Sequence, residues 1–172
     1  MAAKNPKQQK KGTKPDPDQK TVVATNRAAR RDYDILDTLE CGMVLRGSEA
    51  KSLRESKVTL TDAFARIDDG EMFILSLHIT PYSHAALHSG HEPDRRRKLL
   101  MHRNQIDRWA DRLDREPLTL IPLSLYFKGN KAKVELALAR GKTQVDRRRD
   151  IAKRDSDRDI ARAMSNNRRQ RG

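Results

Sequence analysis

The histidines are the first side chains in this sequence that could support catalysis or hold a metal ion. Three of the five lie within the segment YSHAALHSGHEPD or at its edge, and two flank it: His78, His84, His88, His91 and His102. No cysteine joins them, and only Glu92 and Asp94 bring carboxylates close by, so the set of possible metal ligands is poor. We therefore expect no metal site and interpret the segment as a solvated loop that can touch phosphate.

Other groups that could act as nucleophiles have no catalytic partner in the sequence. Ser52, Ser76 and Ser83 lack the setting of a nucleophile elbow, and no base stands beside Cys41. No glycine-rich loop of the type that cradles phosphates occurs. These observations argue against an enzyme, and we expect no cofactor.

Arginine clusters carry the clearest chemistry of the chain. Three segments, NRAARRDY, DRRRKLL and GKTQVDRRRDIAKRD, are separated by stretches that predict folded structure. The 172 residues include 37 Lys and Arg against 24 Asp and Glu, which gives a formal net charge of +13. Such a surplus favours a polyanionic partner, and three clusters together predict binding to a phosphate backbone. RNA is favoured over DNA because no helix-turn-helix or zinc finger is recognisable.

Membrane insertion and secretion are not indicated. No apolar run approaches the roughly 18 residues that a membrane-spanning helix needs. The N-terminal segment MAAKNPKQQKKGTKPDPDQK lacks the apolar core of a signal peptide, and a single cysteine excludes an internal disulfide framework. We therefore expect a cytoplasmic protein with no membrane partner.

The elements that must position the arginines are mostly short strands. The segment RDYDILDTLECGMVL alternates apolar and polar residues and predicts a strand that bends or bulges at Gly42. Turn dipeptides at 69–70 and 129–130 separate apolar runs and predict two hairpins. Pro122, within the second hairpin, indicates an edge position or a bulge.

Two helices are predicted between the strands. SEAKSLRESK favours a short helix behind Ser48 as N-cap, and DRRRKLLMHRNQIDRWADRLDRE places apolar residues near helical spacing over most of its length. Five or six strands with one or two helices predict a fold that is mainly β with flanking helices, built as a small antiparallel barrel.

We divide the chain into three segments: a disordered basic extension over 1–24, a barrel over 25–140 and a basic C-terminal tail over 141–172. In the tail, Ile151, Ile160 and Met164 form no continuous apolar stripe. A helix there would gain little from packing and would need a partner, so we expect the tail to be disordered when free and helical only when bound.

Six motifs resemble, in order and spacing, the bacterial tmRNA-binding family of SsrA-binding or SmpB proteins: NRAARRDY, LECGMVLRGSEAKSLRES, HITPY, DRRRKLLMHRNQI, LIPLSLYFKGNKAKVELALARGK and DRRRDIAKRD. The resemblance runs from about Asn26 to the C-terminus, and GSEAKSL and LALARGK are its most specific parts. It implies an OB-like β-barrel and an RNA-binding adaptor without enzymatic activity. Such an adaptor binds the tRNA-like domain of tmRNA and delivers it to stalled ribosomes for trans-translation, in which nascent chains are tagged and ribosomes rescued.

The resemblance also implies functional residues. The positions that match tmRNA-binding residues of the family, with their basic neighbours, are Asn26, Arg27, Arg30, Glu40, Lys98 and Leu100. Periodicity alone would place Leu100 in the core and would read Glu40 as an exposed strand carboxylate. The positions that match the ribosome-binding tail, expected in the decoding centre and empty mRNA channel of the stalled 70S ribosome, are Gly141, Lys142, Asp146, Arg147, Arg148, Lys153 and Arg154.

Three residues depart from the family pattern. Val145 stands where relatives often have histidine, Ser156 where they often have tryptophan, and Arg31 where histidine or lysine is usual. Base stacking at 145 or 156 is therefore not expected in this chain.

Two other functions stay open at this point. The chain could be a ribosomal or other structural RNA-binding protein, or an enzyme that uses the histidine-rich loop. RNA that co-purifies with the protein would separate these hypotheses, since one dominant tRNA-like species, bulk ribosomal RNA and no RNA are three different results.

Overall fold

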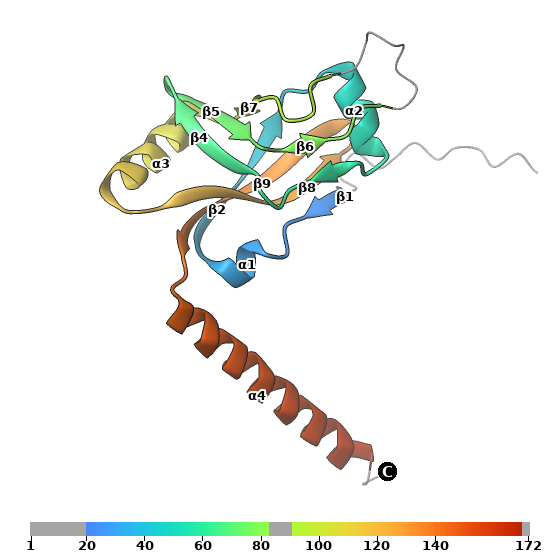
Figure 1. The fold of residues 1–172 in the computed structure, drawn as a ribbon, viewed down its shortest axis with the longest axis vertical. Helices are drawn as coiled ribbons and strands as arrows, with labels where there is room; N and C mark the ends of the chain where they lie inside the picture. Colours follow the sequence, from blue (N-terminus) through green and yellow to red (C-terminus); the bar gives the residue numbers. More distant parts are fainter. Residues whose placement is uncertain (1–19, 83–90, 170–172) are drawn as a thin grey trace, which may run out of the picture.

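The computed structural model describes residues 20–82 and 91–169 of the chain. Figure 1 shows a body rich in strands, from which one long helix projects. The elements, in chain order, are β1 Lys20–Thr25, α1 Ala29–Asp32, β2 Tyr33–Met43, α2 Gly47–Arg54, β3 Val58–Thr59, β4 Phe64–Asp68, β5 Glu71–Leu75, β6 His78–Ile79, β7 Arg97–Leu100, α3 Arg103–Arg115, β8 Thr119–Lys128, β9 Lys131–Gly141 and α4 Gln144–Arg169.

Within the described residues, six strands close into a ring. β8 pairs with β4, and the order continues through β5, β7, β2 and β9, which pairs back with β8. All pairings in the ring are antiparallel. β1 adds to the C-terminal half of β8, while β3 and β6 form a separate small sheet. The mainly antiparallel β fold with flanking helices is therefore confirmed, and the closed ring is compatible with the OB-like barrel that the resemblance implied.

The barrel interior is a continuous apolar core, and burying each large aliphatic side chain there contributes about 1.5–3 kcal/mol. α3 adds Ile106 and Trp109 to this core, and α2 adds Leu53. On the outer face of β8 and β9, α1 packs on a smaller apolar cluster through Ala29. The helices thus occupy fixed places on the barrel, which is what allows them to present side chains to a ligand.

Both predicted hairpins are confirmed. The β4–β5 turn places Asp69 and Gly70 at φ values of 49° and 71°, as a type I′ turn requires. In the β8–β9 turn, Gly129 has a φ of 58°. The register of β8 shifts between Pro122 and Ser124, so the bulge indicated by the proline is confirmed as well.

The bulge predicted at Gly42 is wrong. In β2 the register shifts between Ile35 and Asp37 instead. Gly42 has a different role, since β2 pairs there with β9 on one side and with β7 on the other. A Cβ atom at Gly42 would lie 3.4 Å from the Cβ of Leu100, which is an ordinary van der Waals contact. A small side chain would therefore also fit beside β7 at this position.

The prediction of one helix over most of residues 94–116 is also wrong in its first third. Residues Arg97–Leu100 form β7, and α3 begins only at Arg103, after His102 in an extended conformation. β7 lies between β2 and β5, and its alternate residues Arg97 and Leu99 are buried. Pairing on both edges of the strand outweighs local helix propensity here. For helix α2, Ser48 was predicted as the N-cap. In the structure the N-cap is Arg46, two residues earlier.

The boundaries of the barrel differ from the predicted 25–140 at its start. Residues Lys20–Thr25 form β1 and pair with β8, so the extension predicted over 1–24 is at least five residues too long. Val23 and Ala24 pack against the main core, which explains why this segment is ordered. Residues 1–19 lie outside the described part of the chain. β9 ends at Gly141, close to the predicted boundary with the tail.

The tail is helical over Gln144–Arg169 without a partner, whereas a helix only on binding was predicted. Alanines and arginines favour helix, and a cap described below starts it. The described side chains of its second half are exposed, among them Ile160 and Met164, so none of these apolar side chains packs on the barrel. Figure 1 shows α4 pointing away from the body. That the free tail spends most of its time unfolded in solution stays a prediction.

Candidate nucleic-acid interface

Three of the predicted RNA-binding residues line one hollow on the outside of the barrel. Glu40 comes from β2, and Lys98 and Leu100 come from β7, which pairs with β2 at Gly42. The hollow has a volume of about 580 Å³ and extends to the β4–β5 turn and to Arg103 in the first turn of α3. Residues that lie about sixty positions apart in sequence therefore meet because their strands are neighbours in the barrel.

Leu100 is an exposed apolar surface within this hollow. Its exposure is 54%, whereas the exposure of its neighbour Leu99 is 1%. The core position that periodicity favoured for Leu100 is thus wrong, because β7 is a strand and alternates its two faces. Leu100 also borders a second hollow of about 470 Å³, whose rim includes Arg54 and Lys131. An apolar side chain between cationic rims suits an unstacked base whose phosphates lie on either side.

Glu40 is held by two partners from other strands. The hydroxyl of Tyr126 on β8 donates a hydrogen bond to one carboxylate oxygen, and the ammonium of Lys133 on β9 lies 3.2 Å from the other. The hydrogen bond from Tyr126, helped by Lys133, holds the pKa of Glu40 below its usual value. Burial and the Glu40 carboxylate raise the pKa of Tyr126, so this phenol stays a donor. Glu40 is therefore an ionised acceptor at a fixed place, with its side chain 43% exposed.

The charge in the hollow is mixed rather than uniformly positive. The ammonium of Lys98 contacts the carboxylate of Glu71, and each side chain is close to half exposed. Carboxylates repel phosphate but accept hydrogen bonds from base amino groups and from ribose 2′-hydroxyls. The hollow can therefore distinguish a nucleotide with donors from a bare phosphate. Sequence reasoning missed Lys133 and Tyr126, because only the pairing of β2, β9 and β8 brings them to Glu40.

The other three predicted RNA-binding residues lie beside α1, at the opposite end of β2. Asn26 accepts a hydrogen bond at its Oδ1 from the backbone N–H of Ala29, at 3.1 Å, and donates to the carbonyl of Leu60. It therefore fixes the turn before α1. Arg27 and Arg30 are exposed on that turn and helix, and neither forms an ion pair within the described residues. They are available for phosphate.

The two groups of RNA-binding residues do not form one pocket. Tyr33, at the end of α1, and Glu40 are seven residues apart on β2, which corresponds to about 23 Å. A ligand that touches both must be extended along the barrel surface, as a folded RNA is.

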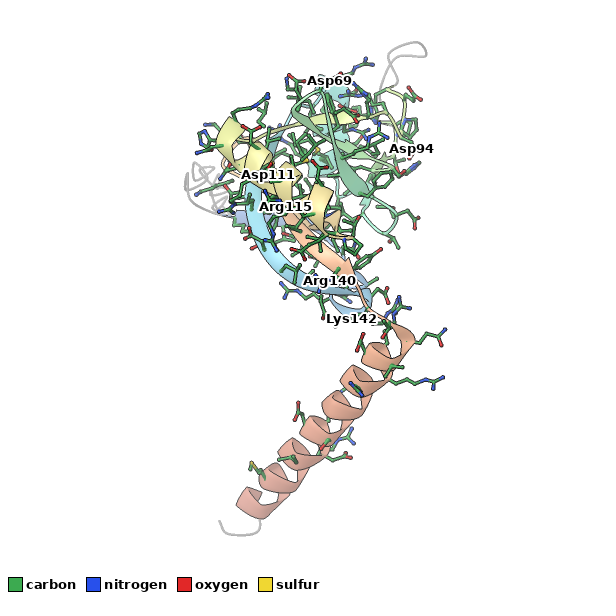
Figure 2. The ribbon with its side chains drawn as sticks, turned by 90° about the vertical axis from the view of Figure 1, so that its left-hand side faces the viewer. Asp69, Asp94, Asp111, Arg115, Arg140 and Lys142 are labelled. Atoms are coloured by element: carbon green, nitrogen blue, oxygen red, sulfur yellow. The ribbon has the colours of Figure 1, made fainter. Side chains whose placement is uncertain are left out.

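The first tail residues are tied to the barrel. Gly141 ends β9, and the backbone N–H of Lys142 donates to the carbonyl of Asp32 at 2.9 Å. The side chain of Lys142 is only 9% exposed, and its ammonium lies 3.3 Å from Asp34. Figure 2 shows Arg140 and Lys142 at the end of the barrel where α4 begins, with Asp69 at the far end. Lys142 is thus not displayed to a partner in the way that the resemblance implied.

The remaining tail residues fall on α4. Asp146 hydrogen-bonds to Thr143, and the guanidinium of Arg147 lies 3.8 Å from Asp32. Arg148 is exposed. Lys153 and Arg154 lie within the helix, and their side chains are outside the described ones.

The second arginine cluster, DRRRKLL, is largely structural. Arg97 is fully buried, its Nε lies 2.9 Å from the carboxylate of Glu49, and it donates to the carbonyls of Leu77 and Pro93. Arg95 makes two hydrogen bonds to the same buried carboxylate, which also accepts from the backbone N–H of Arg46. Burying these charges is tolerated because each is paired and hydrogen-bonded. Interpreting this cluster as an RNA-binding segment is therefore wrong for Arg95 and Arg97.

The histidines that the structure describes serve local contacts. His91 is buried between the hydroxyl of Ser48 and the carbonyl of Ile79, at 3.1 and 3.0 Å, while His78 pairs with Asp94. His84, His88 and Ser83 lie outside the described residues. In the described ranges, no group of three or more His, Cys, Asp or Glu is placed to hold a metal ion.

Cys41 on β2 is a buried free cysteine. Burial raises the pKa of the Cys41 thiol to about 12, so this thiol is not a nucleophile at neutral pH. No helix among the described residues is both long and apolar enough to cross a membrane.

The comparison with family models and curated proteins gives one consistent result. A family model described as "SmpB protein" matches residues 23–166. An SsrA-binding protein of Mycolicibacterium vanbaalenii is 54% identical over 143 residues, which cover 83% of this chain and 86% of the relative. An SsrA-binding protein of Chloroflexus aggregans is 51% identical over 143 residues, covering 83% of this chain and 90% of the relative.

A solved structure is similar as well. It is described as "tmRNA-SmpB: a journey to the center of the bacterial ribosome". The matched chain has a TM-score of 0.59 and 45% sequence identity, and the match covers 70% of this chain and 85% of that one.

Proposed function

The chain belongs to the SmpB protein family, and from this premise we propose that it is an RNA-binding adaptor in trans-translation. It binds the tRNA-like domain of tmRNA and delivers it to stalled ribosomes, where nascent chains are tagged and ribosomes released. The observation that carries the proposal is the hollow that unites Glu40 of β2 with Lys98 and Leu100 of β7, residues that the family resemblance singled out and that come from strands far apart in sequence.

The barrel is the tmRNA-binding part. Leu100 offers an apolar face to a base, Lys98 and Lys133 offer ammonium groups to nearby phosphates, and Glu40 accepts from a base amino group or a 2′-hydroxyl. Arg27 and Arg30 make a second, purely electrostatic contact at the α1 end. Two contacts about 23 Å apart suit a folded RNA better than a short single strand.

The tail is the ribosome-binding part. Its described cations are exposed, namely Arg147, Arg148, Arg149, Arg158 and Arg162, and the apolar side chains described on the same helix are exposed as well. Phosphates that line the empty mRNA channel beside the decoding centre are a suitable partner for such a helix. No enzymatic step and no cofactor is part of this function, and the chain works in the cytoplasm, where ribosomes are.

Sequencing of the RNA that co-purifies with the protein tests the proposal. We expect one dominant tRNA-like species that corresponds to tmRNA. Bulk ribosomal RNA without that species would support a structural RNA-binding protein instead, and recovery of no RNA would contradict both. For variants of Glu40, Glu135→Gln is the matched control. Glu135 is a carboxylate on the same outer face as Glu40, but it does not line the hollow.

A further inference from the structure

Asp146 is an unexpected residue in a segment that should meet phosphate. It stands directly before Arg147–Arg149, and a carboxylate there would repel the RNA that the arginines attract. The structure assigns its oxygen to a different partner, because Asp146 accepts from the hydroxyl of Thr143 at 2.5 Å and from the backbone N–H of Thr143 at 3.2 Å. The carboxylate is thus occupied within the protein.

The contact between the two residues is reciprocal. The backbone N–H of Asp146 donates to the hydroxyl oxygen of Thr143 at 3.3 Å. Thr143 directly precedes α4, which starts at Gln144, so Thr143 is the N-cap and Asp146 is the third helical residue. This is a capping box, in which the two side chains satisfy backbone N–H groups that have no partner within the helix. The hydrogen bonds from the Thr143 hydroxyl and backbone lower the pKa of Asp146, so it stays negative at the positive end of the helix dipole.

The residue before the cap fixes the helix to the barrel. Lys142 donates its backbone N–H to Asp32, and its ammonium lies 3.3 Å from Asp34 and 3.4 Å from the carbonyl of Arg30. One turn into the helix, Arg147 approaches the carboxylate of Asp32. The start of α4 is therefore held by α1 and the first residues of β2.

We propose that Lys142, Thr143 and Asp146 form a joint that starts the tail helix and sets the direction in which it leaves the barrel. Lys142 and Asp146 are then positioning residues and not ribosome ligands. With the first turn formed, the costly nucleation step of helix formation is complete before the tail meets RNA. The arginines from Arg147 onwards then project from the helix in a defined order. The expected effect on tagging rests on the proposed function, whereas the role of the three residues in starting and directing the helix does not.

Far-UV circular dichroism of the full chain without RNA tests the joint. Thr143→Val and Asp146→Ala should each lower the helix–coil equilibrium constant of the tail about fivefold, as expected when a cap is lost. Thr143→Ser and Asp146→Glu, which retain a capping box, should keep the wild-type signal. Asp157→Ala is the matched control, because it removes an exposed carboxylate from the same helix outside the cap. Fluorescence of Trp109, buried in the barrel, checks that every variant is folded.

Tagging on stalled ribosomes then separates positioning from direct contact. Asp146→Ala should reduce tagging several-fold, while Asp146→Glu and Asp157→Ala should retain it and all variants should bind tmRNA equally. Unchanged helix content in Asp146→Ala and Thr143→Val would overturn the proposal that these residues start the tail helix. Loss of tagging in Asp146→Glu, with its helix intact, would show that the carboxylate itself contacts the ribosome and would overturn the positioning role. Failure of the wild-type chain to bind tmRNA would contradict the proposed function and leave the dichroism result standing.

Discussion

The barrel and the tail carry similar charges and place them in opposite surroundings. In the barrel, Glu49 and Arg97 are fully buried and hold each other in place with several further hydrogen bonds. In the tail, the pair Asp159 and Arg162 is loose, at 3.7 Å, with both side chains more than three-quarters exposed. Charge in the barrel therefore builds a rigid surface for one RNA, and charge in the tail is left for a partner that supplies phosphates.

A buried pair and an exposed pair should differ most in stability. Glu49→Gln should lower the free energy of unfolding by about 3–5 kcal/mol, because it leaves buried arginines with an incomplete partner. Glu116→Gln makes the same substitution in an exposed pair with Arg140 and should cost about 0.5 kcal/mol or less. Urea unfolding followed by Trp109 fluorescence measures both. Equal losses in the two variants would mean that the barrel does not depend on its buried charges.

The same buried pair predicts a dependence on pH. Burial alone raises the pKa of Glu49, but hydrogen bonds from Arg95 and from the Arg46 backbone, with the charge of Arg97, outweigh it and hold the pKa below its usual value. A carboxyl group whose pKa is lower in the folded state stabilises the fold above its unfolded pKa, about 4.3, and this stabilisation is lost as the pH falls. Unfolding free energy should fall between about pH 5 and pH 3. The plot of unfolding free energy against pH should be flatter for Glu49→Gln than for the wild type over that range. Parallel plots would show that Glu49 is not the cause of the pH dependence.

Two adjacent leucines sharpen the difference between core and interface. Leu99→Ala should cost about 2–5 kcal/mol of stability, since Leu99 is buried in the core. Leu100→Ala should leave stability within about 0.5 kcal/mol and weaken tmRNA binding about tenfold. Thermal unfolding and gel-shift titration of both variants measure the contrast. A Leu100 variant that is unstable but binds normally would place this residue in the core after all.

Glu40 should show a smaller effect, confined to binding. Glu40→Gln keeps an acceptor for Tyr126 but loses the charge that holds Lys133, so tmRNA binding should weaken about fivefold. Glu135→Gln, on the neighbouring strand, makes the same change outside the hollow and should bind like the wild type. Gel-shift titrations at one salt concentration compare the two, and equal affinities would remove Glu40 from the interface.

Local signals in the sequence predicted the parts of the fold that depend on few residues. The hairpins follow from two-residue turns, and the boundary near Gly141 follows from the loss of apolar alternation. β7 was missed because RRRKLL has helix-forming residues, and only pairing with β2 and β5 makes it a strand. The burial of Arg97 could not be predicted either, since Glu49, its partner, is 48 positions away.

In the candidate site, too, some residues were predicted from the sequence and others were revealed only by the fold. Family resemblance pointed to Glu40 and Leu100, yet composition alone gave no reason to join them. Lys133 became visible only through the pairing of β9 with β2. Lys142 and Asp146 match the family tail in sequence, but their contacts turn inward to the barrel and to Thr143. Sequence patterns can identify such residues without saying which partner they contact.

Removal of residues 143–172 tests the division of labour between barrel and tail most directly. The truncation keeps Lys142, whose backbone bond to Asp32 belongs to the barrel. The account predicts that the truncated chain binds the tRNA-like domain of tmRNA with nearly wild-type affinity in the presence of competitor RNA, and that it supports no tagging on stalled ribosomes. Tagging by the truncated chain, or loss of tmRNA binding from a barrel that remains folded, would contradict it.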